Sequence, residues 1–200
     1  RQPSYPDDRH RGWSALQRGD SSTARVLLED ALDVARRQGD TVQQAITLNN
    51  LGRAYGEQRD ESAAWDRHTL ALELFRNLGD RHGMALSSSW LCHWGLGNGD
   101  RSLAIEYGQE AVRLLRTLGA RRNLVWTLVD LAVLLIPTEP ASSLELLDES
   151  LRLAQQGVET RARVWCLEAL AGLLLARGGR LNLAARLLES ASGLAQPIGY

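Results

Sequence analysis

Turn signals recur in this chain about every 20 residues. Most are a glycine followed by an aspartate, with an arginine in one glycine's place: Gly19-Asp20, Gly39-Asp40, Arg59-Asp60, Gly79-Asp80 and Gly99-Asp100. Other breaks continue the series at Gly119-Ala120, 137–140, Gly157, Gly178-Gly179 and Gly199. Glycine adopts the left-handed backbone that closes one helix, and aspartate accepts hydrogen bonds from the free N–H groups that open the next. The chain can therefore form only short elements joined by tight turns.

The segments between these breaks predict helices, among them 41–58, 61–78, 102–118 and 161–177. In 102–118 apolar residues recur at steps of three and four, as one helical face requires: Leu103, Ala104, Tyr107, Ala111, Leu114, Leu115 and Leu118. No segment shows the sustained alternation of a strand. Helices of this length with such short turns pack as antiparallel hairpins, so we predict an all-α fold.

Small residues show that the repeating unit is a pair of helices. Alanines stand 40 residues apart in two series, Ala24, Ala64 and Ala104, and Ala31, Ala71 and Ala111. The pattern continues, with slippage, through Ser143 and Ser150, then Ala184 and Ala191. We predict one repeat domain over 1–200 with five hairpins, 1–40, 41–80, 81–120, 121–158 and 159–199. Pro3 and Pro6 should leave only a short first helix around 9–17, and the start of the chain suggests a piece of a longer protein.

Composition excludes several classes of protein. The apolar fraction of 44% is ample for a packed core, and the formal net charge of −1 gives no general attraction to nucleic acid. No apolar run reaches the roughly 18 residues of a membrane span. Cys92 and Cys166 are too few for a disulfide framework and lie in apolar stretches, which fits a reducing cytoplasm. We expect no direct nucleic-acid binding by this chain and no membrane association.

The sequence offers little catalytic chemistry. The histidines His10, His68, His82 and His93 show no metal-binding spacing. Next to His93, Cys92 is better explained as a core residue at the small position equivalent to Gly52. The glycine-rich run 95–99 follows a helix rather than a strand, which favours a hairpin turn over a phosphate cradle. We therefore predict no enzyme, no cofactor and no metal.

The second hairpin carries a recognisable motif. Leu48-Asn49-Asn50-Leu51-Gly52, then Tyr55, Ala64 and Ala71, resembles the tetratricopeptide signature, and Leu170-Ala171 with Leu174 repeats it. The resemblance implies a right-handed α-α superhelix, a tetratricopeptide-like solenoid. The 40-residue period and the stretch from Trp165 to Gly172, followed by 184–188, are similar to repeats of bacterial regulators of the MalT/LuxR type. In those signal-transduction ATPases the repeats form a sensor or interaction domain between an ATPase module and a helix-turn-helix. Neither of those modules is visible here.

The resemblance also implies a working surface. Stacked hairpins curve into a concave face lined by the first helix of each pair, where a peptide, a protein or a small effector can bind. Counting from the Leu-Gly positions, ten residues should lie there: Asn49, Asn50, Arg53, Ser89, Trp90, His93, Trp126, Asp130, Trp165 and Glu168. Trp126 and Trp165 occupy the places of Ile46 and Leu86. They either line the groove or pack successive hairpins together.

Two functions remain open. The first is a non-catalytic interaction and effector-sensing domain of a bacterial transcriptional regulator. The alternative is an assembly scaffold or homodimerisation module of another signalling protein, with a cyclase, kinase or ATPase output. Leucines of 181–196 could drive self-association in that case: Leu183, Leu187, Leu188 and Leu194.

Overall fold

The computed structural model describes residues 5–95, 97, 100–157, 160–178 and 181–195. Within these ranges the regular structure consists of ten α-helices and no strand. The chain divides into two compact units, Arg1–Asp100 and Arg101–Tyr200, and each is described by itself. None of the described helices is both long enough and apolar enough to span a membrane. The all-α prediction is confirmed.

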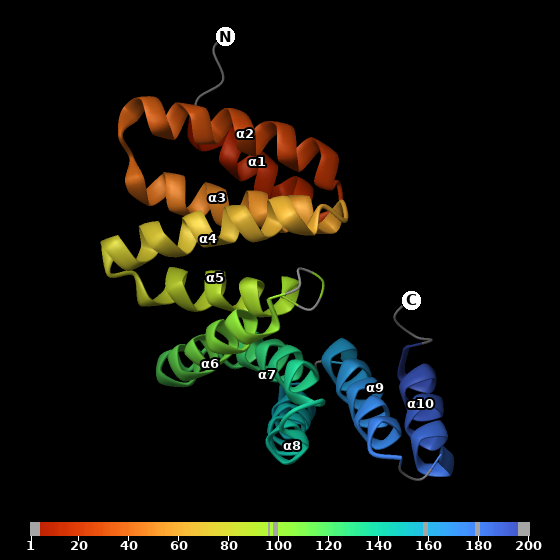
Figure 1. The fold of residues 1–200 in the computed structure, drawn as a ribbon. Coiled ribbons are helices and arrows are strands. Elements are labelled where there is room, and N and C mark those ends of the chain that lie inside the picture. The colour runs from red at the N-terminus through yellow and green to blue at the C-terminus, as the bar shows by residue number, and fades with distance from the viewer. Residues whose placement is uncertain (1–4, 96, 98–99, 158–159, 179–180, 196–200) are drawn as a thin grey trace. The chain divides into compact units, whose positions relative to one another are not determined.

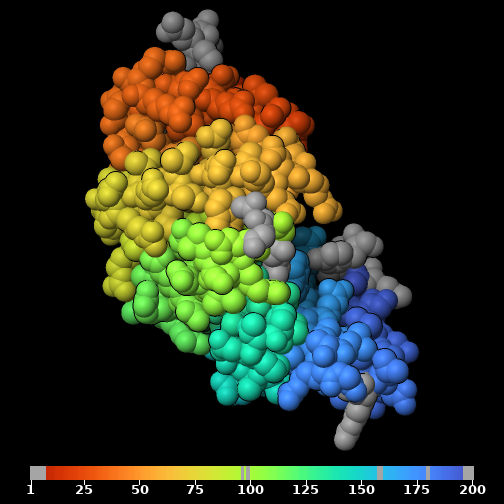
Figure 2. Space-filling view, viewed as in Figure 1, coloured from red at the N-terminus to blue at the C-terminus, as the bar shows by residue number. Residues whose placement is uncertain are grey.

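The first unit is a run of antiparallel helices, each packed on the next in sequence. The helices are α1 (Tyr5–Gln17), α2 (Ser21–Gln38), α3 (Thr41–Glu57), α4 (Glu61–Leu78) and α5 (Arg81–Trp94). The succession of the helices can be followed in Figure 1. Besides these sequential contacts, α1 touches α3 and α3 touches α5. In the space-filling view the bands of α2, α3 and α4 lie against one another without a break (Figure 2). First helices therefore contact first helices, as in a stack of hairpins.

The second unit repeats this arrangement. Its helices are α6 (Arg101–Leu118), α7 (Arg121–Leu135), α8 (Pro140–Gly157), α9 (Thr160–Ala176) and α10 (Leu181–Ala195). Each packs on the next, and α7 also touches α9 (Figure 1). The small residues of both alanine series, together with Ser143, Ser150, Ala184 and Ala191, are buried. Small side chains thus stand where the paired helices approach, as the repeat pattern predicts.

The turns have the predicted chemistry. Gly19, Gly39, Gly79, Gly119 and Gly178 have positive φ, and Arg59 takes the same left-handed conformation with φ of 66°. Four aspartates cap the helices that follow by accepting backbone N–H groups: Asp20, Asp40, Asp60 and Asp80. At Asp40 the structure shows only half of a capping box, since Gln43 donates its backbone N–H while its Oε1 is buried without a partner. Of the run 95–99, Leu96, Asn98 and Gly99 lie outside the described residues, as does Gly199.

The prediction of a short first helix around 9–17 was wrong. Helix α1 begins at Tyr5, four residues before the predicted start, and Pro6 is its second residue. A proline in the first turn costs no hydrogen bond, because the first N–H groups of a helix have no intrahelical partner.

Arg59 provides a test of the turn assignment. Left-handed backbone costs a residue with a side chain about 1–2 kcal/mol. We therefore expect Arg59→Gly to raise the free energy of unfolding by about 0.5–1 kcal/mol, part of the gain being offset by the entropy of glycine in the unfolded chain. Urea denaturation followed by circular dichroism measures the change. The matched control is Gly39→Ala, at φ of 66° with open space around it, which should lose stability instead.

Candidate partner-binding surface

One face of the first unit is formed by α1, α3 and α5. Three residues at 40-residue intervals, Trp13, Arg53 and His93, lie on these first helices. The guanidinium carbon of Arg53 lies 5.6 Å from the centre of the Trp13 ring, a cation–π contact. Trp13 is 42% exposed, and Arg53 and His93 are half-buried. We call these residues the Trp13–Arg53–His93 face.

Arg53 is held in place by three partners. Its Nε donates a hydrogen bond to Oε1 of Glu57 at 2.8 Å, one turn later in α3. Its Nη2 donates to the backbone carbonyl of Leu16 at 3.3 Å, near the end of α1. With the Trp13 ring on its face, the guanidinium is fixed between two helices while about a quarter of the side chain stays exposed. Such a preorganised cation can receive an anionic or polar group at little entropic cost.

On α5 an aromatic cluster continues this face. Trp90 and Trp94 stack with ring centres 6.2 Å apart, and the His93 ring forms a T-shaped pair with each of them, with ring centres 5.9 Å and 4.6 Å apart. All three side chains are half-buried. Aromatic groups that present part of a ring to solvent supply large contact area with little loss of rotamer freedom, as partner-binding residues do.

Asn49 is half-buried, and its side-chain oxygen is engaged by neighbouring helices. Its Oδ1 accepts hydrogen bonds from Nδ1 of His68 at 3.0 Å and from the Ser87 hydroxyl at 3.1 Å. The amide therefore joins α3 to α4 and α5. Asn49 acts in the packing of three helices, and its expected contact with a ligand stays a prediction.

His68 is the most perturbed group of this unit. It is fully buried, and its ring stacks on Trp90 with centres 5.7 Å apart. Burial, helped by the nearby His93, lowers the pKa of His68 to about 3, so the ring is neutral at physiological pH. Because Oδ1 of Asn49 can only accept, Nδ1 of His68 carries the proton and Nε2 is left as a buried acceptor without a partner.

Two glycines of α3 make room for these rings. A Cβ built on Gly52 would lie 2.5 Å from Nε2 of His68, and one on Gly56 would overlap the indole of Trp94. The Leu-Gly of the motif thus has a packing role, since the backbone of α3 must approach the aromatic side chains of α4 and α5 closely.

The remaining residues of the first unit that were predicted to line the binding surface offer less of their surface to solvent or bond within their own helix. Asn50 is buried at 9% exposure. Ser89 is half-buried and donates its hydroxyl to the carbonyl of Ala85 in its own helix at 2.7 Å. Cys92 is buried and reduced, as expected of a core residue at the place of Gly52.

The other four predicted residues belong to the second unit. Trp126 on α7 and Trp165 on α9 meet edge to face with ring centres 6.0 Å apart, so the tryptophans pack successive hairpins together. Both keep part of their surface exposed, whereas Asp130 is buried at 5% exposure and Glu168 is exposed. The sequence placed the two tryptophans at equivalent positions of successive first helices, and in the structure their rings touch. The roles of all ten residues in binding stay predictions.

Sequence reasoning missed Trp13, His68 and Trp94 as parts of this region. A signal for Trp13 was present, because it stands 40 residues before Arg53. His68 lies four residues after Ala64 and three before Ala71, on the same helical stripe as the two small residues. Among the described residues no group of three or more His, Cys, Asp or Glu could hold a metal ion.

Comparison with known proteins agrees with this geometry. The tetratricopeptide repeat model matches residues 11–82. Two solved structures resemble nearly the whole chain, both of a putative kinesin light chain from Podosopora anserina with nearly identical tetratricopeptide-like repeats. The Q17M form gives a TM-score of 0.73 at 16% identity over 96% of this chain and 95% of that one. The other gives 0.71 at 16% identity over 98% and 97%.

The fold is tetratricopeptide-like. No curated protein matches the chain. Tetratricopeptide repeats generally mediate protein–protein interaction and are typically non-catalytic scaffolds. At 16% identity the structural likeness concerns the fold alone, and the bound partner has to be sought in the residues of this chain.

Proposed function

We propose that this chain is the interaction and sensing domain of a cytoplasmic bacterial transcriptional regulator of the MalT/LuxR type, and that its Trp13–Arg53–His93 face binds a protein or peptide segment. The observation that carries the binding proposal is the fixed guanidinium of Arg53. It lies on an exposed indole and is held by Glu57 and the end of α1, on the face that also bears Trp90 and Trp94.

The chemistry of this face favours an extended segment with a carboxylate or carbonyl group beside an apolar side chain. Arg53 would donate hydrogen bonds to these oxygen atoms through the N–H groups that Glu57 and the Leu16 carbonyl do not use, since a guanidinium carries five donors. Trp13 and the α5 aromatics would receive the apolar group. A small effector with the same two features could use the same residues.

The regulator assignment rests on the likeness of the 40-residue repeats, and of the stretch around Trp165, to those of MalT/LuxR-type proteins. In such a protein the face would couple binding to an ATPase and a helix-turn-helix module. The sequence on either side of this chain tests the assignment directly. A cyclase or kinase module there, without a helix-turn-helix, would contradict it.

The binding proposal predicts the effect of changing Arg53. We would screen a library of 12-residue peptides by tryptophan fluorescence and take forward the peptide that binds best. Arg53→Ala should weaken that peptide at least tenfold, because a hydrogen bond to a charged group is worth about 1.5–3 kcal/mol. Arg53→Lys should fall in between, since lysine keeps the charge but loses the planar fork.

Arg37→Ala, which removes an exposed arginine of α2, serves as the control and should leave affinity unchanged. Circular dichroism checks that each variant is folded. A best peptide whose affinity is the same for Arg53→Ala, Trp13→Ala and the unaltered chain would overturn the assignment of this face.

A further inference from the structure

The second unit has a groove of about 330 Å³ between α6 and α8, which we call the α6–α8 groove. Both helices pack on α7, which contributes Leu131 and Leu135 to the lining. Val112 of α6 and Leu146 of α8 complete its apolar part. Small-molecule sites in proteins measure roughly 300–1,000 Å³, so a groove of this volume suits a ligand of one ring and a short tail.

The polar groups of the groove divide by charge between its two walls. The α6 wall carries Arg113 and, one turn before it, Gln109, whereas Glu139 and Glu145 lie on the α8 wall. All four residues are exposed. The Glu139 carboxylate is held just before the start of α8, because its Oε2 accepts the hydroxyl of Ser142 at 3.0 Å.

A further arginine of the groove, Arg116 of α6, does not add to the positive charge of its wall. It forms an ion pair with Glu149 of α8. The groove therefore sets one wall with hydrogen-bonding groups and a single cation, Arg113, against a wall with two carboxylates. This asymmetry matches a ligand with a hydroxyl at one end and a cationic group at the other.

The internal repeat shows which chemical groups fit such a groove. In the first unit α2, α3 and α4 form the equivalent surface, 80 positions before α6 and α7 and 79 before α8. By this count Tyr55 stands at the place of Leu135, and Arg67 at that of Leu146. The guanidinium carbon of Arg67 lies 5.7 Å from the centre of the Tyr55 ring, a cation–π contact. Where the α6–α8 groove has two leucines, the first unit thus holds a phenol ring and a cation.

The hydroxyl of Tyr55 meets the helix that corresponds to α6. It donates a hydrogen bond to Oε1 of Glu29 on α2 at 2.7 Å, and Glu29 stands at the place of Gln109. The ring itself packs against the buried core of the first unit. A phenol therefore fits this kind of groove with its ring on the apolar residues and its hydroxyl toward the place of Gln109.

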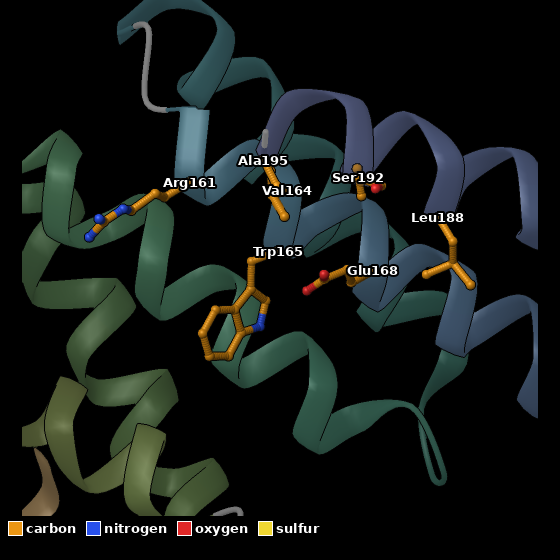
Figure 3. A pocket seen from close by; sticks show the side chains of 8 residues that line it. Arg161, Val164, Trp165, Glu168, Leu188, Ser192 and Ala195 are labelled. Atoms are coloured by element: carbon orange, nitrogen blue, oxygen red, sulfur yellow. The ribbon is translucent and has the colours of Figure 1, made fainter. Parts of the chain in front are cut away.

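The α6–α8 groove differs in kind from a groove of about 440 Å³ between α9 and α10 (Figure 3). The surface equivalent to the α9–α10 groove is covered by a helix one hairpin earlier, where Trp165 of α9 packs on Trp126. Such a surface receives the next helix of a stack. The counterpart of the α6–α8 groove is filled instead by Tyr55 and Arg67 of its own helices, so stacking does not call for a helix there.

We propose that the α6–α8 groove binds a small aromatic amine with a phenolic hydroxyl. The ring lies on the apolar lining, and the ammonium group pairs with Glu139 and Glu145. The hydroxyl donates to Oε1 of Gln109 and accepts from Arg113, since a phenol does both. The site uses none of the residues of the Trp13–Arg53–His93 face and does not depend on the function proposed for that face.

The test is a titration of the isotope-labelled chain with tyramine, followed by nuclear magnetic resonance. We expect saturable shifts of the backbone amide signals of the α6 and α8 residues that line the groove. Hydroxyphenylpropionate keeps the ring and the hydroxyl but carries a carboxylate, so it should bind at least tenfold more weakly. Phenethylamine lacks only the hydroxyl and should bind about fivefold more weakly than tyramine.

Two sets of substitutions assign the binding to this groove. Glu139→Gln combined with Glu145→Gln should weaken tyramine about fivefold, as expected for two exposed charge pairs, whereas Glu73→Gln on α4 should leave its affinity unchanged. Leu135→Tyr combined with Leu146→Arg places in the groove the two side chains that fill its counterpart, and should abolish binding. Circular dichroism verifies that each variant is folded.

Three outcomes would overturn the proposal. The first is the absence of saturable shifts at millimolar tyramine, or shifts that leave the amides of α6 and α8 unmoved. The second is equal affinity for tyramine and hydroxyphenylpropionate. The third is unchanged tyramine affinity in the folded variant with Leu135→Tyr and Leu146→Arg. If that variant does not fold, unchanged affinity after the two glutamate substitutions decides against the proposal in its place.

Discussion

Gly52→Ala should lower the free energy of unfolding by about 2 kcal/mol, although alanine is the better helix former by roughly 1 kcal/mol. The added methyl group would lie 2.5 Å from Nε2 of His68 and within 2.7 Å of two further ring atoms. The ring cannot move aside easily, because it is fully buried, stacked on Trp90 and hydrogen-bonded to Asn49.

A double-mutant cycle separates this clash from other effects. His68→Ala alone should cost about 2–4 kcal/mol because it leaves a cavity. In that background Gly52→Ala should become neutral or stabilising, since the methyl group enters space that the ring has left. The sign of one substitution therefore depends on the residue at position 68.

The matched control is Gly172→Ala in the middle of α9. A Cβ there meets nothing within 4 Å, so alanine should add up to about 1 kcal/mol through helix propensity. Urea denaturation of the four variants and the unaltered chain, followed by circular dichroism, provides the measurements. If Gly52→Ala were as stabilising as Gly172→Ala, the close packing of α3 on His68 would be refuted.

The turns were predictable because their chemistry is local. Gly and Asp act on the backbone within a few residues, so the spacing of the breaks gives the ends of α4 to the residue and those of α3, α6 and α9 within one. Even the left-handed Arg59 follows from the series. The start of α1 did not follow, since prolines restrain only the residues next to them and tolerate the first turn of a helix.

The candidate surface was less predictable because it depends on contacts between helices. Repeat spacing correctly brought Trp126 and Trp165 together, since equivalent positions of successive first helices touch. It could not show that the Asn49 amide turns inward, because its partners, His68 and Ser87, lie 19 and 38 residues away. Which way a polar side chain turns depends on partners that periodicity does not identify.

As the pH is lowered from 7 to 4.5, the free energy of unfolding should fall more steeply in the unaltered chain than in the His68→Leu variant. His68 has a pKa of about 3 in the folded chain, against about 6.5 when unfolded, so the unfolded state binds more protons between these values. The stability that the neutral ring preserves is fully present above pH 6.5 and is lost as pH falls toward 3. The slope is about 1.4 kcal/mol per pH unit, which gives roughly 2–3 kcal/mol between pH 7 and 4.5.

The leucine variant suits this comparison, because Leu28 fills the equivalent place in the first hairpin, opposite Gly12. Carboxylates titrate in both proteins, so the difference between the two pH profiles isolates His68. The control His82→Gln removes an exposed histidine and should keep the steep profile. Nuclear magnetic resonance gives a second reading, in which the His68 ring signals should not titrate between pH 8 and 4.5. Identical profiles for His68→Leu and the unaltered chain would mean that the buried ring is not held neutral by its surroundings, and the account of the Asn49–His68–Trp90 packing would have to change with it.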